Sequence, residues 1–220
     1  MPRSPARPFW IAVLALLGAL LLSVMVGSVF IPPGDLLRTL ASGLSRRPPA
    51  GAEGQTLATI LFSLRLPRTI LVAMTGAALA GSGAAYQGLF RNPLADPYLI
   101  GVASGAGLGA VLAMSVDWPY TTLGLLAVPL AAFLAGLLTV FAVSQLARSG
   151  RALPTSSLIL AGVAVSSFAT ALTSYLMLNA TGELRRALVW LLGGSTLTGW
   201  GPVLALLPYW LVGLGTLLTM

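Results

Sequence analysis

The sequence has 220 residues, of which 57% are hydrophobic and only 8% are charged. Soluble domains carry about 25% charged residues, so this composition and the long apolar runs indicate a membrane protein. The net charge of +7 does not indicate nucleic-acid binding, because the twelve basic residues are all arginine and are scattered singly or in pairs, whereas a phosphate backbone requires a basic stripe.

Three residue types are missing from the chain: cysteine, histidine and lysine. Their absence excludes disulfides, the commonest metal ligand and the lysine of an ATP-binding P-loop. We therefore expect no catalytic residue, no metal site and no cofactor. The five acidic residues all lie outside the apolar runs. A proton- or sodium-coupled carrier usually keeps an ionisable group at membrane depth, so that class is disfavoured.

The first apolar run follows Arg3 and Arg7 and is too long for the core of a signal peptide. It predicts a retained membrane helix at about residues 9–30, with the N-terminus in the cytoplasm. Residues 35–54 are polar and predict a loop, with a short helix at 36–44 as an option. Further membrane helices are predicted at about 69–90, 98–116, 123–146, 155–178 and 202–219, with a short outer helix at 183–192. The expected fold is all-α, a polytopic transmembrane bundle of about six membrane helices in a single domain, 1–220.

The arginines are distributed unusually across this topology. Five of them fall in the cytoplasm and seven outside, which opposes the positive-inside rule. Either the orientation is inverted, or the outer arginines have a role of their own. We keep the orientation and interpret the outer excess as a surface for an external acidic partner.

Arg65 and Arg68 flank Leu66-Pro67 at the expected start of the second membrane helix. Residues three apart lie on one side of a helix, and proline suits a first turn. One interpretation is a docking pair for carboxylates of a partner, since arginine makes bidentate contacts. The other is an interfacial anchor for the helix, and spacing alone does not separate the two.

Small residues recur through the second and third predicted helices. Gly76 and Gly83 lie in the second, and Gly101, Gly105 and Gly109 form a stripe with a four-residue spacing in the third. Small residues let membrane helices approach closely. We expect these five glycines to pack against neighbouring helices.

Two short polar segments are candidate gate elements. Asn92-Pro93-Leu94 and Asp96-Pro97 break the helix after Phe90, giving either a plain turn or a constriction at which Asn92 and Leu94 control passage. Thr155 and Ser156 follow Pro154 and serve either to cap the next helix or to form the opposing side of that gate.

Four segments in chain order resemble the FecCD-type permeases. They are R-L-P-R at 65–68, the long run from Gly76 to Ala106, T-S-S-L-I-L-A-G-V at 155–163 and W-L-L-G-G-S at 190–195. These permeases are the membrane subunits of ABC importers for iron–siderophore chelates, haem and vitamin B12. The resemblance covers nearly the whole chain, and the run around residues 76–106 is highly specific.

The resemblance implies roles for the matching residues. Arg65 and Arg68 would receive acidic residues of a substrate-binding protein, while Asn92, Leu94, Thr155 and Ser156 would form a cytoplasmic gate. The implied partners are a second permease, as homodimer or heterodimer, two cytoplasmic ATPase subunits, the extracytoplasmic binding protein and membrane lipid.

The implied function is import of an iron chelate across the cytoplasmic membrane by alternating access, with ferric siderophore ahead of haem or cobalamin. Such permeases have about ten helices, so the chain is expected to be a permease truncated after the sixth. The competing hypotheses are a non-transporting membrane fragment and a channel or secondary carrier.

Overall fold

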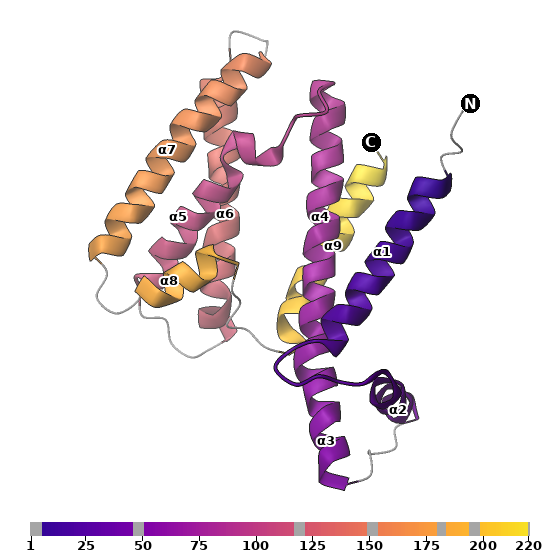
Figure 1. Ribbon diagram of the computed structural model, residues 1–220. Coiled ribbons are helices and arrows are strands. Elements are labelled where there is room, and N and C mark those ends of the chain that lie inside the picture. Colours follow the sequence, from indigo (N-terminus) through magenta and orange to yellow (C-terminus); the bar gives the residue numbers. More distant parts are fainter. Residues whose placement is uncertain are drawn as a thin grey trace. The chain divides into compact units, whose positions relative to one another are not determined.

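Figure 1 shows the computed structural model, which describes residues 6–45, 51–116, 122–148, 154–179, 184–193 and 199–219. Every regular element in these ranges is a helix. The chain divides into two compact units, Met1–Leu79 with Leu197–Met220, and Ala80–Thr196. The boundary falls inside one long helix, because each half of that helix packs with different elements.

The first unit is built from both ends of the chain. It contains α1 (Ala6–Met25), α2 (Pro33–Leu44), α3 (Gly51–Thr59), the π-helix η1 (Ile60–Arg65), the first part of α4 (Leu66–Phe90) and α9 (Gly201–Thr219). Its small core consists of the buried residues Val24, Ile31, Leu36 and Leu61. The hydroxyls of Ser23 and Thr69, 2.9 Å apart, join α1 to α4. The indole Nε1 of Trp210 donates to the carbonyl of Met74 at 2.9 Å and joins α9 to α4.

The first helix is shorter than the predicted range of 9–30, because α1 ends at Met25. The chain then leaves the helix, and the N–H of Ile31 returns to the carbonyl of Met25 at 3.0 Å. The last carbonyls of a helix need donors from elsewhere. Here the guanidinium of Arg65 supplies them, a contact between distant positions that apolar patterning does not reveal.

The second predicted helix, 69–90, is the end of a much longer helical run. The elements α3, η1 and α4 continue without a break from Gly51 to Phe90, 40 residues in all. The sequence prediction placed residues 51–54 in a polar loop, but they belong to α3. It also placed Pro67 in the first turn of the helix. The π-helix before Pro67 instead lets the helix continue past it, since π turns accommodate local breaks in the α-helical register.

The second unit contains the end of α4, the 3₁₀ turn η2 (Pro97–Ile100), α5 (Val102–Met114), α6 (Thr122–Leu146), α7 (Thr155–Asn179) and α8 (Leu184–Leu191). Within it, α5, α6 and α7 pack on one another, and α8 lies against α5 (Figure 1). The predicted short helix 183–192 corresponds to α8, and its first residue, Glu183, lies outside the described residues.

The third predicted helix, 98–116, differs most from the structure. Residues 98–100 form part of η2, and α5 has only 13 residues. Gly101 separates them with φ of 79°, a left-handed conformation that interrupts an α-helix and that glycine adopts without a steric penalty. The helix α5 is therefore about 20 Å long, shorter than the hydrocarbon layer of about 30 Å.

The glycine stripe lies where α5 meets its neighbours. A Cβ added at Gly105 would overlap the side chain of Thr139 in α6, and one at Gly109 would lie 2.5 Å from the carbonyl oxygen of Ala131. A Cβ at Gly101 would lie 2.6 Å from the hydroxyl of Ser166 in α7. These three positions therefore require glycine for the observed helix separations.

Gly76 and Gly83 do not show the close packing that we expected. A Cβ at either position would meet no atom within 4 Å in the part of the chain that the structure describes. Gly76 follows the buried Met74 by two residues, which places it about 160° away from the buried side of α4 at 100° per residue.

Five helical segments in the described ranges are long and apolar enough to cross a membrane. They are Arg7–Met25, Gly51–Phe90, Leu126–Leu146, Thr155–Asn179 and Gly201–Thr219. The shorter α5 is the sixth apolar segment. The prediction of an all-α, polytopic transmembrane bundle is confirmed.

Candidate functional site

The segment between α4 and η2 begins with a well-defined helix end. Arg91 has φ of 49°, its N–H reaches the carbonyl of Gly88, and the N–H of Asn92 reaches the carbonyl of Gln87. This is the pattern of a Schellman motif, in which glycine normally takes the left-handed position. Arginine in that position carries a conformational cost of about 1 kcal/mol.

Two similar turns then shape the segment. The Oδ1 of Asn92 accepts the N–H of Leu94 at 2.9 Å, and the Oδ1 of Asp96 accepts the N–H of Tyr98 at 2.8 Å. In each turn the bond passes over a proline, which has no N–H of its own. Side-chain oxygens of Asn and Asp commonly bond the backbone two residues ahead in this way. The segment therefore has a fixed backbone conformation.

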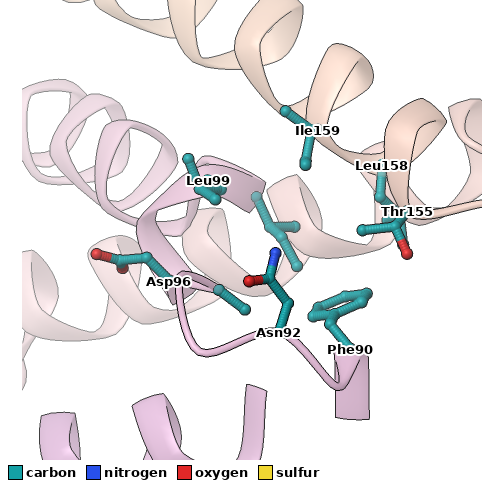
Figure 2. Close-up of a pocket in the computed structure, with 9 residues that line it drawn as sticks. Phe90, Asn92, Asp96, Leu99, Thr155, Leu158 and Ile159 are labelled. Carbon is teal, nitrogen blue, oxygen red and sulfur yellow. The ribbon is translucent and has the colours of Figure 1, made fainter. Parts of the chain in front are cut away.

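A small cavity of about 30 Å³ lies between this segment and the start of α7. Its lining residues are Phe90, Asn92, Ala95, Asp96, Leu99, Ile100, Thr155, Leu158 and Ile159. Figure 2 shows the amide nitrogen of Asn92 directed among these residues and the carboxylate of Asp96 directed away from them. The volume admits about two water molecules, far less than the roughly 300 Å³ of a small-molecule site. The cavity is therefore too small to be a substrate pocket.

The four predicted gate residues have different positions at this contact. Asn92 and Thr155 both line the cavity, from opposite sides. Leu94 is 83% exposed and Ser156 is exposed, and neither lines it. Thr155 and Ser156 are the first two residues of α7, and the carbonyl of Pro154 accepts the first helical bond, from Leu158 at 3.0 Å. The N-cap position is thus taken by Pro154, because its carbonyl begins the helix.

Most of the contact is apolar, and its apolar residues are not among those predicted to form the gate. Ile100 and Leu158 are buried together with Val143 in α6 and Ala147, the residue that follows α6. Gly162 allows this arrangement, since a Cβ there would overlap the carbonyl of Leu99. The approach of η2 to α7 brings together the backbones of Leu99 and Gly162, which are 162 − 99 = 63 residues apart, so no local pattern indicates it.

Arg65 and Arg68 lie at the junction of η1 and α4 in the first unit. Nη1 of Arg65 donates to the carbonyls of Val24 at 2.7 Å and Met25 at 3.0 Å, and its Nη2 donates to the carbonyl of Val29. These three bonds leave two of the five guanidinium N–H groups for other acceptors. Arg68 is exposed. The two arginines therefore have unequal environments.

Comparison with known proteins gives consistent matches. The sequence profile described as the FecCD transport family matches residues 14–220. A cobalamin import system permease protein, BtuC, of Halobacterium salinarum is 42% identical over 164 residues, which cover 74% of this chain and 43% of that protein. A vitamin B12 import system permease protein, BtuC, of Klebsiella pneumoniae is 38% identical over 202 residues, covering 89% of this chain and 54% of that protein.

An uncharacterized ABC transporter permease protein, YvrB, of Bacillus subtilis is 37% identical over 197 residues. The alignment covers 89% of this chain and 55% of that protein. The chain thus spans about half the length of these curated relatives. A solved structure of an ABC transporter assigned to the metal-chelate type, in an inward-facing conformation, aligns with a TM-score of 0.68 and 26% identity. That alignment covers 95% of this chain and 59% of the solved chain.

Proposed function

Because the chain belongs to the FecCD transport family, we propose that it acts as a membrane-spanning permease subunit of an ABC importer for a preformed metal chelate. The match of the family over residues 14–220 carries this proposal. The chain is a transport subunit and not an enzyme. It has no lysine and so no P-loop lysine to hold ATP, and we assign ATP hydrolysis to two separate cytoplasmic subunits.

The substrate class is proposed from two kinds of similarity. Two of the relatives are named for cobalamin or vitamin B12, and the solved structure is of the metal-chelate type. Cobalamin is itself a metal chelate, so both agree on a metal ion that arrives already bound. We place cobalamin first, and a ferric siderophore, the expectation from the sequence, second, with haem third.

Uptake measurements test this proposal. The gene is expressed in cells that lack their own chelate permeases but retain the ATPase and binding proteins, and uptake of radiolabelled cobalamin, ferric siderophore and haem is compared. We expect uptake of one chelate that depends on the ATPase. Absence of uptake for all three, with the chain present in the membrane, would contradict the proposal.

The contact around Asn92 and Thr155 is the proposed gate at the cytoplasmic end of the pathway. The cavity of about 30 Å³ is too small to admit a chelate of this class, so passage would require these elements to move. In alternating access, the segment 91–97 and the start of α7 would separate to release the solute. We propose that the exposed Leu94 and Ser156 face the second permease of a homodimer or heterodimer, where they complete the gate.

Arg65 and Arg68 are the proposed docking residues for the extracytoplasmic binding protein. Arg68 is exposed and is free to make a bidentate contact with a carboxylate. Arg65 is held by its bonds to the end of α1, so we assign it a smaller direct share and a larger part in shaping the surface. The protein is a multi-pass protein of the cytoplasmic membrane, and its N-terminus is proposed to lie in the cytoplasm, so that these arginines lie outside.

A further inference from the structure

The carbonyl of Phe62 has an unusual place in the backbone of the first unit. It lies in the π-helix η1, where each N–H bonds to the carbonyl five residues earlier. The N–H of Leu66 follows this rule and donates to the carbonyl of Leu61. The next donor in the same register would be residue 67, which is a proline and has no N–H. The π register therefore provides no backbone donor for the carbonyl of Phe62.

A distant side chain occupies this position. The indole Nε1 of Trp200 donates to the carbonyl oxygen of Phe62 at 2.9 Å, across a sequence separation of 138 residues. The backbone of Trp200 is engaged as well, because its carbonyl accepts the N–H of Leu204 at 3.0 Å and begins α9. One residue thus starts α9 and attaches it to η1.

We propose that Trp200 is a positioning residue. Its indole replaces the hydrogen bond that Pro67 cannot donate to the carbonyl of Phe62, and so it stabilises the π-helical register of η1, which ends at Arg65. A carbonyl that loses its hydrogen-bond donor costs free energy until another donor replaces it. Without the indole, the simplest remedy is an α-helical register, in which the N–H of Leu66 bonds to the carbonyl of Phe62. Removing the extra residue of a π turn rotates the preceding residues by about 100°.

Such a rotation would change the arginine pair directly. Arg65 is the last residue of η1, and its guanidinium reaches the carbonyls at the end of α1 only from its present direction. Arg68 lies beyond the junction in α4 and would keep its place. The relative direction of the two arginines therefore depends on Trp200. This consequence for docking rests on the proposed function, whereas the hydrogen-bond replacement does not.

A double-mutant cycle on the full chain, purified in detergent, tests the replacement. Trp200→Phe removes the donor and keeps most of the ring, while Pro67→Ala restores a backbone N–H at residue 67. The readout is hydrogen–deuterium exchange of the segment 60–68, together with the thermal midpoint. We expect Trp200→Phe to accelerate exchange in this segment by about five- to tenfold, as for one lost hydrogen bond. In the Pro67→Ala background, the same change should alter exchange less than twofold.

Trp210 provides the matched control. Its Nε1 donates to the carbonyl of Met74 in α4 at 2.9 Å. The α-helical donor to that carbonyl would be Ala78, four residues later, and Ala78 has an N–H. Pro67→Ala should therefore leave the effect of Trp210→Phe unchanged. Equal effects of Trp200→Phe with and without Pro67→Ala, or no effect at all, would overturn the inference. These readouts need neither substrate nor partner, so they are independent of the transport experiment.

Discussion

The contact between α5 and α6 at Gly109 sets a narrow limit on what this position accepts. A Cβ there would lie 2.5 Å from both the carbonyl oxygen of Ala131 and the Cβ of Ala135. Neither atom can rotate away, because one is backbone and the other is attached directly to it. Reaching an ordinary contact of 3.4 Å requires the two helices to separate locally by about 0.9 Å.

The expected cost of Gly109→Ala follows from this displacement. A gap of 0.5–1 Å forfeits about a quarter to a half of each dispersion contact, and overpacking typically costs about 1–3 kcal/mol. Alanine recovers about 1 kcal/mol through its higher helix propensity. The net loss is about 0–2 kcal/mol, which corresponds to a decrease of up to about 8 °C in the thermal midpoint at 2–4 °C per kcal/mol for a chain of this size.

The measurement is thermal unfolding of the purified chain in detergent, with Gly136→Ala as the matched control. Gly136 lies in α6 at the same helix pair, and a Cβ there would meet its nearest atoms, in Val102, at 3.6 Å, which is an ordinary contact. Gly136→Ala should leave the midpoint unchanged or raise it. If Gly109→Ala proves as stable as Gly136→Ala, the packing argument for this interface is wrong.

Other predictions concern the arginines. Arg91→Gly should raise the free energy of unfolding by about 1 kcal/mol, since glycine accepts the left-handed conformation freely, and thermal unfolding would measure it; a lower midpoint would contradict this. Arg68→Glu should weaken binding-protein affinity at least tenfold through charge reversal and leave the thermal midpoint within about 2 °C. Arg65→Glu should lower both the binding-protein affinity and the stability. The free energy of unfolding should fall by about 2–4 kcal/mol, because the change removes three charged hydrogen bonds at once. Titration calorimetry and thermal unfolding of both variants separate the two roles, and equal thermal effects would argue against them.

Much of the fold follows from local patterns. Apolar runs predicted the membrane helices, because burying about 20 apolar residues in lipid dominates every other local preference. The four-residue spacing of Gly101, Gly105 and Gly109 was also visible in the sequence, and the structure packs all three against α6 or α7. Glycine content alone did not distinguish this stripe from Gly76 and Gly83. Whether a glycine is closely packed depends on which neighbouring helix lies against its side of the helix, and the local sequence does not specify that neighbour.

The parts that could not be predicted all depend on contacts between distant residues. The helix α1 ends early because Arg65, 40 residues later, donates to its last carbonyls. The π-helix η1 involves Trp200, 138 residues beyond Phe62. At the candidate gate, Asn92 was identifiable from its place before a proline, but Gly162 was not, because its closest contact is the backbone of Leu99. Such contacts cannot be predicted from the local sequence around either residue.

The first unit draws its helices from both ends of the chain, and this has a consequence for synthesis. Residues 80–196 must be made before α9 can join α1 and α4. At about 5–20 residues per second, the 117 intervening residues take roughly 6–23 s. During that interval the carbonyl of Phe62 lacks its indole partner, and by its end all of the residues of the second unit have been made. The nascent protein should therefore complete its later unit first and close its earlier one last.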